Sequence, residues 1–192
     1  MACDNALTTL APNCAALKKK GGFDKRFWVG SIADIDAVTY GTDQEVTALT
    51  FTGLTGLKTF TGKRLKHGGN TTLEAGEVVN QRLQNFLPML YAQTAAERAS
   101  LELLADAEDI FIFAESNAGV IEIFGINKGD NDQFDNYGMK CSAAEWKNGV
   151  LLNDDTSCAM TFTGAFDNAP LVFAEGTAIA ANIIALDALV VV

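Results

Sequence analysis

Histidine and paired cysteines are the scarcest sources of chemistry in this sequence. Among 192 residues there is one histidine, His67, and there are four cysteines, at positions 3, 14, 141 and 158. None of the cysteines belongs to a C-x-x-C pair, and structural zinc sites are usually built from such close pairs of Cys or His ligands. We therefore expect no zinc site and free thiols, with Cys141 and Cys158 acting as small core residues.

Basic residues are also few. The sequence has 14 Lys and Arg residues against 24 Asp and Glu residues, and its formal net charge is −10. Proteins that grip nucleic acid neutralise its phosphates with Lys and Arg, so direct DNA binding is not expected. Negative charge would let DNA slide past by repulsion, or it would only keep the protein soluble.

No apolar stretch reaches the length of a membrane span. A spanning helix needs about 20 apolar residues, and the apolar run from Ala178 to Val192 is interrupted by Asn182 and Asp187. The amino-terminal residues do not show the basic and apolar regions of a secretory signal. We expect a buried strand or packing tail at the carboxyl terminus and no membrane anchor.

Motifs of catalysis are missing too. His67 lies between Lys66 and Gly68-Gly69, outside any G-x-S-x-G or H-E-x-x-H pattern, so we expect an exposed loop histidine rather than a general base. A small hydrolase that pairs His67 with a distant Ser or Asp is an alternative. The sequence also contains no glycine-rich phosphate loop. It predicts a non-enzymatic protein without a cofactor.

One loop gathers oxygen ligands. Asp130, Asp132 and Asp135 lie among Asn and Gln residues, and Ca²⁺ prefers such carboxylate and amide oxygens. The loop departs from the EF-hand pattern, which needs Gly at its sixth position and Glu at its twelfth. We expect a solvated turn between strands. A calcium-dependent binding module that uses these three carboxylates is the alternative from a different functional class.

What the sequence does have is apolar surface. Hydrophobic residues make up 48% of it, charged residues only 20%, and 12 residues are Phe. A chain of this length can bury a real core without metals or disulfides. The excess of apolar residues therefore favours surfaces that meet other subunits, in addition to a core.

Alternation of apolar and polar residues predicts strands along most of the chain. It is clearest after Ser157, where Cys158, Met160, Phe162 and Phe166 share one face. We predict strands over 27–32, 46–52, 58–66, 77–87, 110–113, 120–124, 139–146, 159–166 and 171–173.

One helix is predicted over 94–106, because Thr94 and Glu97 match a capping box. The expected fold is mainly β, a β-sandwich or open barrel with one flanking α-helix and extended loop and terminal arms. Its parts are an amino-terminal arm (1–26), a domain (27–174) with a long loop (53–76), and a carboxyl-terminal arm or strand (175–192).

The order of these elements resembles that of tail proteins from phages that infect Bacteroidetes-type bacteria. The resemblance covers most of residues 27–173. The residues that carry it are Met1-Ala2-Cys3, Phe27-Trp28-Val29, Leu101-Glu102-Leu103-Leu104, Ile110-Phe111-Ile112-Phe113, Ile121-Glu122-Ile123-Phe124-Gly125, Tyr137-Gly138-Met139 and Thr161-Phe162-Thr163-Gly164.

The resemblance implies a tail-tube-like β-sandwich whose copies form hexameric rings, stacked around a channel for DNA. The loop 53–76 and the arm 1–26 would bridge adjacent rings. This mapping places the candidate inter-subunit contacts at Lys18, Lys19, Lys20, Lys58, Lys63, Arg64 and Lys66. We expect deletion of 1–26 or of 56–69 to leave a folded monomer that does not polymerise.

The partners implied are further copies of the chain, other virion tail proteins, and DNA that passes through the lumen without sequence-specific binding. The implied location is the virion tail, with the host cytoplasm as the place of assembly. A head–tail adaptor or ring protein, or a capsid-associated protein, is the nearest alternative, because such proteins share the β-sandwich.

Overall fold

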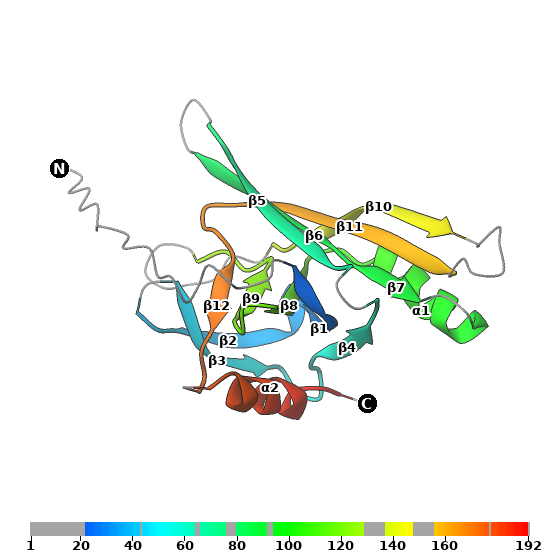
Figure 1. Ribbon diagram of the computed structural model, residues 1–192. Helices are drawn as coiled ribbons and strands as arrows, with labels where there is room; N and C mark the ends of the chain where they lie inside the picture. The colour runs from blue at the N-terminus through cyan, green and yellow to red at the C-terminus, as the bar shows by residue number, and fades with distance from the viewer. Residues whose placement is uncertain are drawn as a thin grey trace.

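The computed structural model describes residues 22–42, 44–63, 66–75, 80–91, 94–128, 137–147, 156–176 and 178–191. Within these ranges the chain forms twelve strands, two α-helices and one short 3₁₀ helix (Figure 1). The elements are β1 Phe23–Ser31, η2 Ile32–Asp34, β2 Ile35–Tyr40, β3 Glu45–Phe51, β4 Lys58–Thr61, β5 Gly68–Glu74, β6 Gln81–Leu87, β7 Met89–Tyr91, α1 Ala95–Ala105, β8 Ile110–Ser116, β9 Ile121–Phe124, β10 Lys140–Lys147, β11 Ser157–Phe166, β12 Leu171–Phe173 and α2 Ile179–Ala188.

The described strands form two sheets, so the predicted mainly β, sandwich-like fold is confirmed. The larger sheet has the order β2-β3-β12-β9-β8-β1-β4, and the smaller has the order β10-β11-β6-β5, with β7 also paired to β11. Neighbouring strands are antiparallel except for β3 and β12, which are parallel. The predicted strands over 110–113 and 120–124 pair as β8 and β9 in a hairpin, and Gly119 takes the positive φ that its turn requires.

The central strand β8 explains why the larger sheet is buried on both faces. Ile110, Ile112 and Ala114 belong to one hydrophobic cluster, and the alternate residues Phe111 and Phe113 belong to another. Successive side chains of a strand point to opposite faces. An uninterrupted apolar strand is therefore stable only where both faces are covered.

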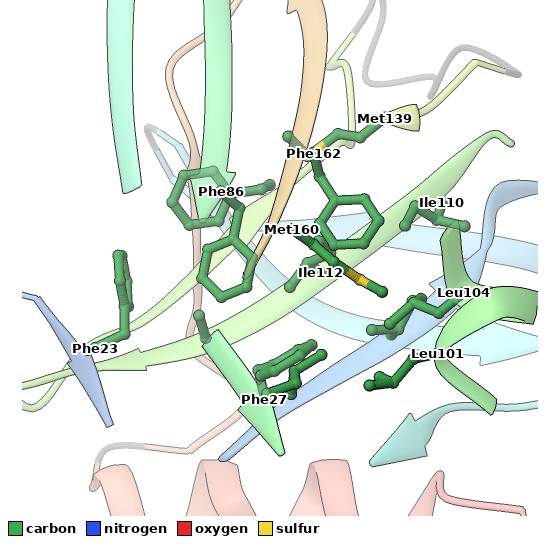
Figure 2. Packing of buried hydrophobic residues seen from close by; sticks show 14 of the residues in the cluster. Phe23, Phe27, Phe86, Leu101, Leu104, Ile110, Ile112, Met139, Met160 and Phe162 are labelled. Carbon is green, nitrogen blue, oxygen red and sulfur yellow. The ribbon is translucent and has the colours of Figure 1, made fainter. Parts of the chain in front are cut away.

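The first cluster fills the space between the two sheets (Figure 2). Phe86 of β6 is at its centre, with ring centroids 5.6 Å from Phe23, 5.3 Å from Phe27 and 5.5 Å from Phe124. Helix α1 closes one side with Leu101, and Figure 2 shows Leu101 and Leu104 pointing toward the phenylalanines. The sandwich core is therefore largely aromatic.

Helix α1 begins as the capping box predicts. The Thr94 Oγ1 accepts a hydrogen bond from the Glu97 N–H at 3.2 Å, and the Glu97 carboxylate accepts one from the Thr94 N–H at 2.8 Å. Both bonds satisfy backbone donors that a helix start leaves free. The helix ends at Ala105, one residue before the predicted limit.

The second cluster lies on the opposite face of the larger sheet, and α2 packs against it. Leu186 is buried in this cluster, and Ile179 and Ile183 pack on its margin. The prediction of an arm or strand at 175–192, and of a single helix, is therefore wrong. A short apolar run fits a buried strand or a buried helix equally well by pattern, and only the surface that it covers decides between them.

The larger sheet is strongly curved, as an open barrel requires. Phe51 of β3 stacks on Phe111 of β8 with 6.3 Å between ring centroids, although β12 and β9 separate these strands in the sheet order. Register shifts between β2 and β3 accompany the bend.

The predicted loop 53–76 is also corrected by the structure, because it contains two strands. β4 pairs with β1 in the larger sheet, and β5 pairs with β6 in the smaller one. Gly69 lies within β5, where a Cβ would come 2.8 Å from the Phe23 ring and 2.9 Å from the Phe124 ring. Glycine is needed there for close packing. The predicted arm 1–26 likewise overlaps β1, which begins at Phe23.

Candidate functional site

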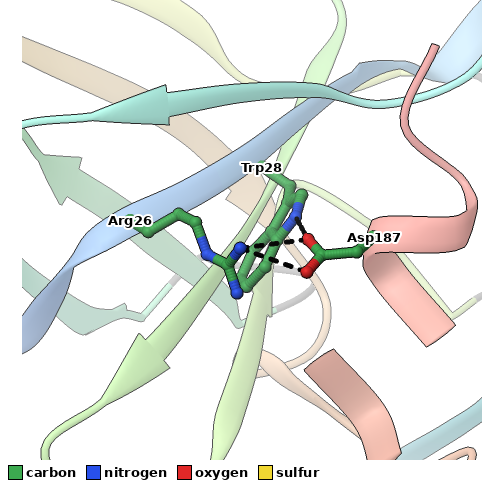
Figure 3. Close-up of polar contacts among 3 residues, drawn as sticks. All are labelled: Arg26, Trp28 and Asp187. Carbon is green, nitrogen blue, oxygen red and sulfur yellow. Dashed lines mark hydrogen bonds and ion pairs between the residues drawn. The ribbon is translucent and has the colours of Figure 1, made fainter. Parts of the chain in front are cut away.

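Helix α2 is held to the sheet by a three-residue polar contact (Figure 3). The Asp187 carboxylate accepts a hydrogen bond from the Trp28 indole Nε1–H at 3.0 Å and pairs with the Arg26 guanidinium at 3.1 Å. The guanidinium carbon also lies 4.5 Å from the centroid of the Trp28 ring, a cation–π contact. The polar residue that interrupts the carboxyl-terminal run is therefore structural.

The end of the chain is tied to the start of β4. The Leu57 N–H donates to the Leu189 carbonyl at 2.9 Å, and the Val191 N–H donates back to the Leu57 carbonyl at 3.1 Å. The Lys58 Nζ donates to the Val191 carbonyl at 2.8 Å. Lys58, a candidate inter-subunit residue, thus has an intramolecular role.

The described basic candidates differ in their burial. Lys63 is half-buried and its N–H donates to the Met89 carbonyl at 2.8 Å, whereas Lys66 is exposed. The remaining candidates, Lys18, Lys19, Lys20 and Arg64, lie outside the described residues. For the described lysines, the structure therefore gives no common contact surface.

His67 is buried, so the expectation of an exposed loop histidine is wrong. Its exposed fraction is 3%, and its ring lies 5.6 Å from the Phe27 ring and 6.5 Å from the Phe86 ring. The Nδ1 accepts a hydrogen bond from the Met89 N–H at 3.3 Å, while the buried Nε2 has no hydrogen-bond partner. Desolvation lowers the pKa of His67, against smaller opposing effects of the Lys25 carbonyl and the Asp24 carboxylate. A substrate has almost no access to this ring.

Two thiols behave as the sequence predicts. Cys158 is buried and Cys141 packs at the margin of the first cluster, and both are free. Burial, with a smaller contribution from Cys141, raises the pKa of Cys158 to about 11, and burial also raises the pKa of Cys141. Protonated thiols are poor nucleophiles and poor metal ligands. Cys3 and Cys14 lie outside the described residues.

Buried amides form a polar network that sequence reasoning missed. The Gln84 side chain accepts a hydrogen bond from the Gly125 N–H at 3.1 Å and donates to the Asn168 carbonyl at 2.9 Å. The Asn168 side chain donates to the Ile126 carbonyl and accepts from the Lys128 N–H. The network ties the turn after β9 to the turn after β11, so its role is structural. The alternation in Gln81–Leu87 is too weak to single out Gln84, so the sequence carried no clear signal for this network.

An open groove of about 930 Å³ runs between α1 and β4. Its walls are mainly apolar, and Leu103 at its edge is 74% exposed. The residues that form most of its apolar surface are Val29, Phe60, Leu103, Leu104, Ala107 and Val191.

The outer face of the smaller sheet has mostly uncharged residues in its central rows, while Glu145 and Lys147 lie in the rows toward one end. Because Cys158, Met160 and Phe162 point into the core, the alternate residues of β11 point outward. The strand register places these residues in rows across the four strands. One row is Lys140, Thr163, Asn85 and Asn70, and the next is Ala165, Leu83 and Thr72.

The hairpin of β5 and β6 projects from the body of the protein (Figure 1). Every residue of β5 after Gly68 is exposed, including Leu73 at 58%. On most protein surfaces, large exposed apolar side chains occur singly.

Metal binding finds no support in the described ranges, where no group of three or more His, Cys, Asp or Glu residues could hold an ion. The calcium candidates Asp130, Asp132 and Asp135 lie outside those ranges. Neither helix in the described part of the chain is long and apolar enough to cross a membrane.

Comparison with known proteins finds no match to a family model, to a curated protein or to a solved structure. The likeness to phage tail proteins therefore rests on the residues quoted for it.

Proposed function

We propose that this protein is a non-catalytic, self-associating subunit of a phage particle, a tail-tube subunit whose rings stack around a channel for DNA. The phage assignment rests on the resemblance of the sequence. Self-association rests on two strand edges that pair with no described strand and on exposed apolar side chains, which a monomer would leave unused.

The projecting hairpin is the observation that carries self-association. β5 has β6 as its neighbour on one side, and no described strand pairs with its other edge. Its Leu73 side chain is exposed beyond the body of the sandwich. An exposed strand edge with an apolar side chain readily pairs with another chain. In a ring or a stack of rings, a neighbouring copy would cover both features.

The opposite edge of the same sheet supports the proposal. β10 pairs with β11, and no described strand pairs with its other edge; all its residues except Cys141 are exposed. Trp146 on this strand is 40% exposed. A heterologous ring needs two different surfaces on each subunit, one to meet each neighbour. The edges at β5 and β10 are two such surfaces.

The outer face of the smaller sheet suits a passage for DNA. Its rows present threonine, asparagine and alanine, with Lys140 as the one cation in the rows described above. Tight DNA binding needs several Lys or Arg side chains to neutralise phosphates. A nearly neutral face would let DNA move past without being held.

Other virion tail proteins would be the remaining partners, with the tail as the final location and the host cytoplasm as the place of assembly. The groove beside α1, with the exposed Leu103, is a separate surface for a contact within such a particle. A head–tail adaptor or ring protein would use the same surfaces to form one closed ring instead of a stack.

The oligomeric state of the intact chain tests the proposal directly. We expect purified protein to form rings that stack into open-ended tubes in negative-stain electron microscopy, with masses in analytical ultracentrifugation that are multiples of the subunit mass. Single closed rings would favour the adaptor instead. A monomer that persists at high concentration would overturn self-association.

A matched pair of variants tests the hairpin. Leu73→Lys places a charge on the projecting strand and should shift the population toward the monomer, with an unchanged thermal melt. Ala37→Lys, an exposed position on β2, introduces the same charge at another edge and should assemble as the wild type does. Equal assembly of both variants would remove the hairpin from the interface.

A further inference from the structure

His67 lies at the corner where the two sheets are joined. It follows β4 of the larger sheet and comes directly before β5 of the smaller sheet. Its carbonyl accepts a hydrogen bond from the Phe23 N–H at 3.3 Å, and its Nδ1 accepts one from the Met89 N–H at 3.3 Å. One residue therefore contacts β1 of the larger sheet and β7 of the smaller sheet.

Two backbone hydrogen bonds surround this side chain. The Gly62 N–H donates to the Lys25 carbonyl at 2.8 Å, and the Lys63 N–H donates to the Met89 carbonyl at 2.8 Å. A Cβ on Gly62 would lie 2.5 Å from the Cε1 of His67. The imidazole is thus packed directly against the backbone that connects the sheets, with no room for it to shift while the corner stays closed.

The surroundings suit only the neutral ring. The Nδ1 acts as an acceptor, so the ring proton is on Nε2, which is buried and has no hydrogen-bond partner. The rings of Phe27 and Phe86 cover the imidazole, and the Phe86 ring is nearly parallel to it, at 4°. A protonated imidazole has two N–H donors and no acceptor. Its Nδ1–H would point at the Met89 N–H, and its charge would lie among hydrocarbon rings.

Few charges around the ring would compensate for protonation. The described titratable groups on the neighbouring elements are Asp24, Lys25 and Arg26 on β1, Lys58 on β4, Lys63 after it, Lys66 on the segment of His67 itself, Glu74 on β5, Arg82 on β6 and Tyr91 on β7. Burial lowers the pKa of His67 and outweighs the Lys25 carbonyl and the Asp24 carboxylate, which both favour the charged ring. β6 contributes the uncharged Phe86 ring.

We propose that His67 is a pH-sensitive contact that holds the β4–β5 corner closed when neutral and releases it when protonated. The contact belongs to the single chain and does not depend on the proposed assembly. An opened corner would free the Met89 N–H and the start of β5, the strand that continues into the projecting hairpin.

The direction of the pH effect follows from linkage. The pKa of His67 is lower in the folded chain than its usual value of about 6.5, so the open form binds more protons than the closed form below that value. The closed corner is fully stable above about pH 6.5 and loses stability as the pH falls toward the folded pKa. Within that window the opening constant rises by up to about tenfold per pH unit.

Because the chain has one histidine, its ring resonances can be followed without ambiguity by NMR. We expect the ring to titrate below the usual value. We also expect hydrogen exchange at the Met89 and Lys63 amides, corrected for intrinsic rate, to accelerate relative to the Phe113 amide of the central strand between pH 7.5 and 5. A ring that titrates at the usual value, or an exchange ratio that does not change with pH, would overturn the proposal.

His67→Gln supplies the control. A glutamine side chain can accept a hydrogen bond but does not titrate, so the Met89-to-Phe113 exchange ratio should no longer depend on pH. Persistence of the wild-type pH dependence in this variant would assign the effect to another group. If the variant does not fold, the titration of the His67 ring and the hydrogen exchange of the wild-type amides still test the proposal.

Discussion

At the scale of single residues, the position of a side chain in the fold decides whether it is buried, more than its residue type does. Phe162 and Thr163 are adjacent on β11, yet Phe162 is 0% exposed within the sandwich core while Thr163 lies in an outer row opposite Asn85. His67, polar and flanked by glycines, lies deeper in the protein than many leucines do. Close glycine packing and aromatic neighbours make that burial possible.

Phe162→Ala should destabilise the protein by about 3 kcal/mol or more, because it removes a fully buried aromatic ring and leaves a cavity. The neighbouring Thr163→Ala should change the free energy of unfolding by no more than about 0.5 kcal/mol, as expected for a surface site. Urea unfolding followed by circular dichroism measures both. A loss below about 1 kcal/mol for Phe162→Ala would mean that the ring does not face the core.

At the scale of elements, the second helix matters most for stability of the larger sheet. Without α2, the face that carries Trp28, Phe111 and Phe113 would lose part of its cover. Asn182 fixes the start of the helix, because its side chain donates to the Phe173 carbonyl at 3.2 Å and accepts from the Gly176 N–H at 2.6 Å. Asp187 fixes the end of the helix through Trp28 and Arg26.

Replacing Asp187 separates the contributions of charge and hydrogen bonding. Asp187→Asn keeps an acceptor for the Trp28 indole and loses only a partly exposed ion pair, so we expect a cost below about 1 kcal/mol. Asp187→Ala also leaves the indole N–H without its partner and should cost about 1–3 kcal/mol. Urea unfolding of the two variants checks the order. An equal cost for both would mean that the indole hydrogen bond contributes nothing.

At the scale of the whole molecule, the two sheets and α2 form three layers, and one of the crossings between the sheets lies between β4 and β5. Residues 56–69, which include this crossing, were expected to be dispensable for folding. The buried Leu57 and His67 lie within or beside it, and β4 belongs to the larger sheet. A deletion of 56–69 would therefore remove part of both cores. We now expect this deletion to give an unfolded chain and not a folded monomer.

Deletion of residues 1–21 is the appropriate replacement experiment. The described core clusters begin with Phe23, so the shortened chain should keep the wild-type circular dichroism spectrum and thermal melt. If the amino-terminal arm joins subunits, the same chain should sediment as a monomer. Assembly equal to that of the full chain would exclude the arm from the interface, and loss of the melt would show that the fold needs it.

The sequence by itself determined the local features: the apolar run of β8, the alternation that makes β11 a strand, and the capping box at Thr94. Each of these depends on residues within a few positions of one another, so periodicity and capping chemistry suffice. The sequence suggested a function only through a resemblance to phage tail proteins. The comparisons with known proteins add no further support, because they find no match.

Tertiary structure alone decided the burial of His67, the pairing of β4 with β1 and of β5 with β6, and the helical form of 179–188. Distant residues are the deciding partners: Met89 and Phe27 for His67, and Trp28 for Asp187. Short apolar or polar segments have no strong intrinsic preference, and the free energy of covering a distant surface exceeds the small differences between their local conformations.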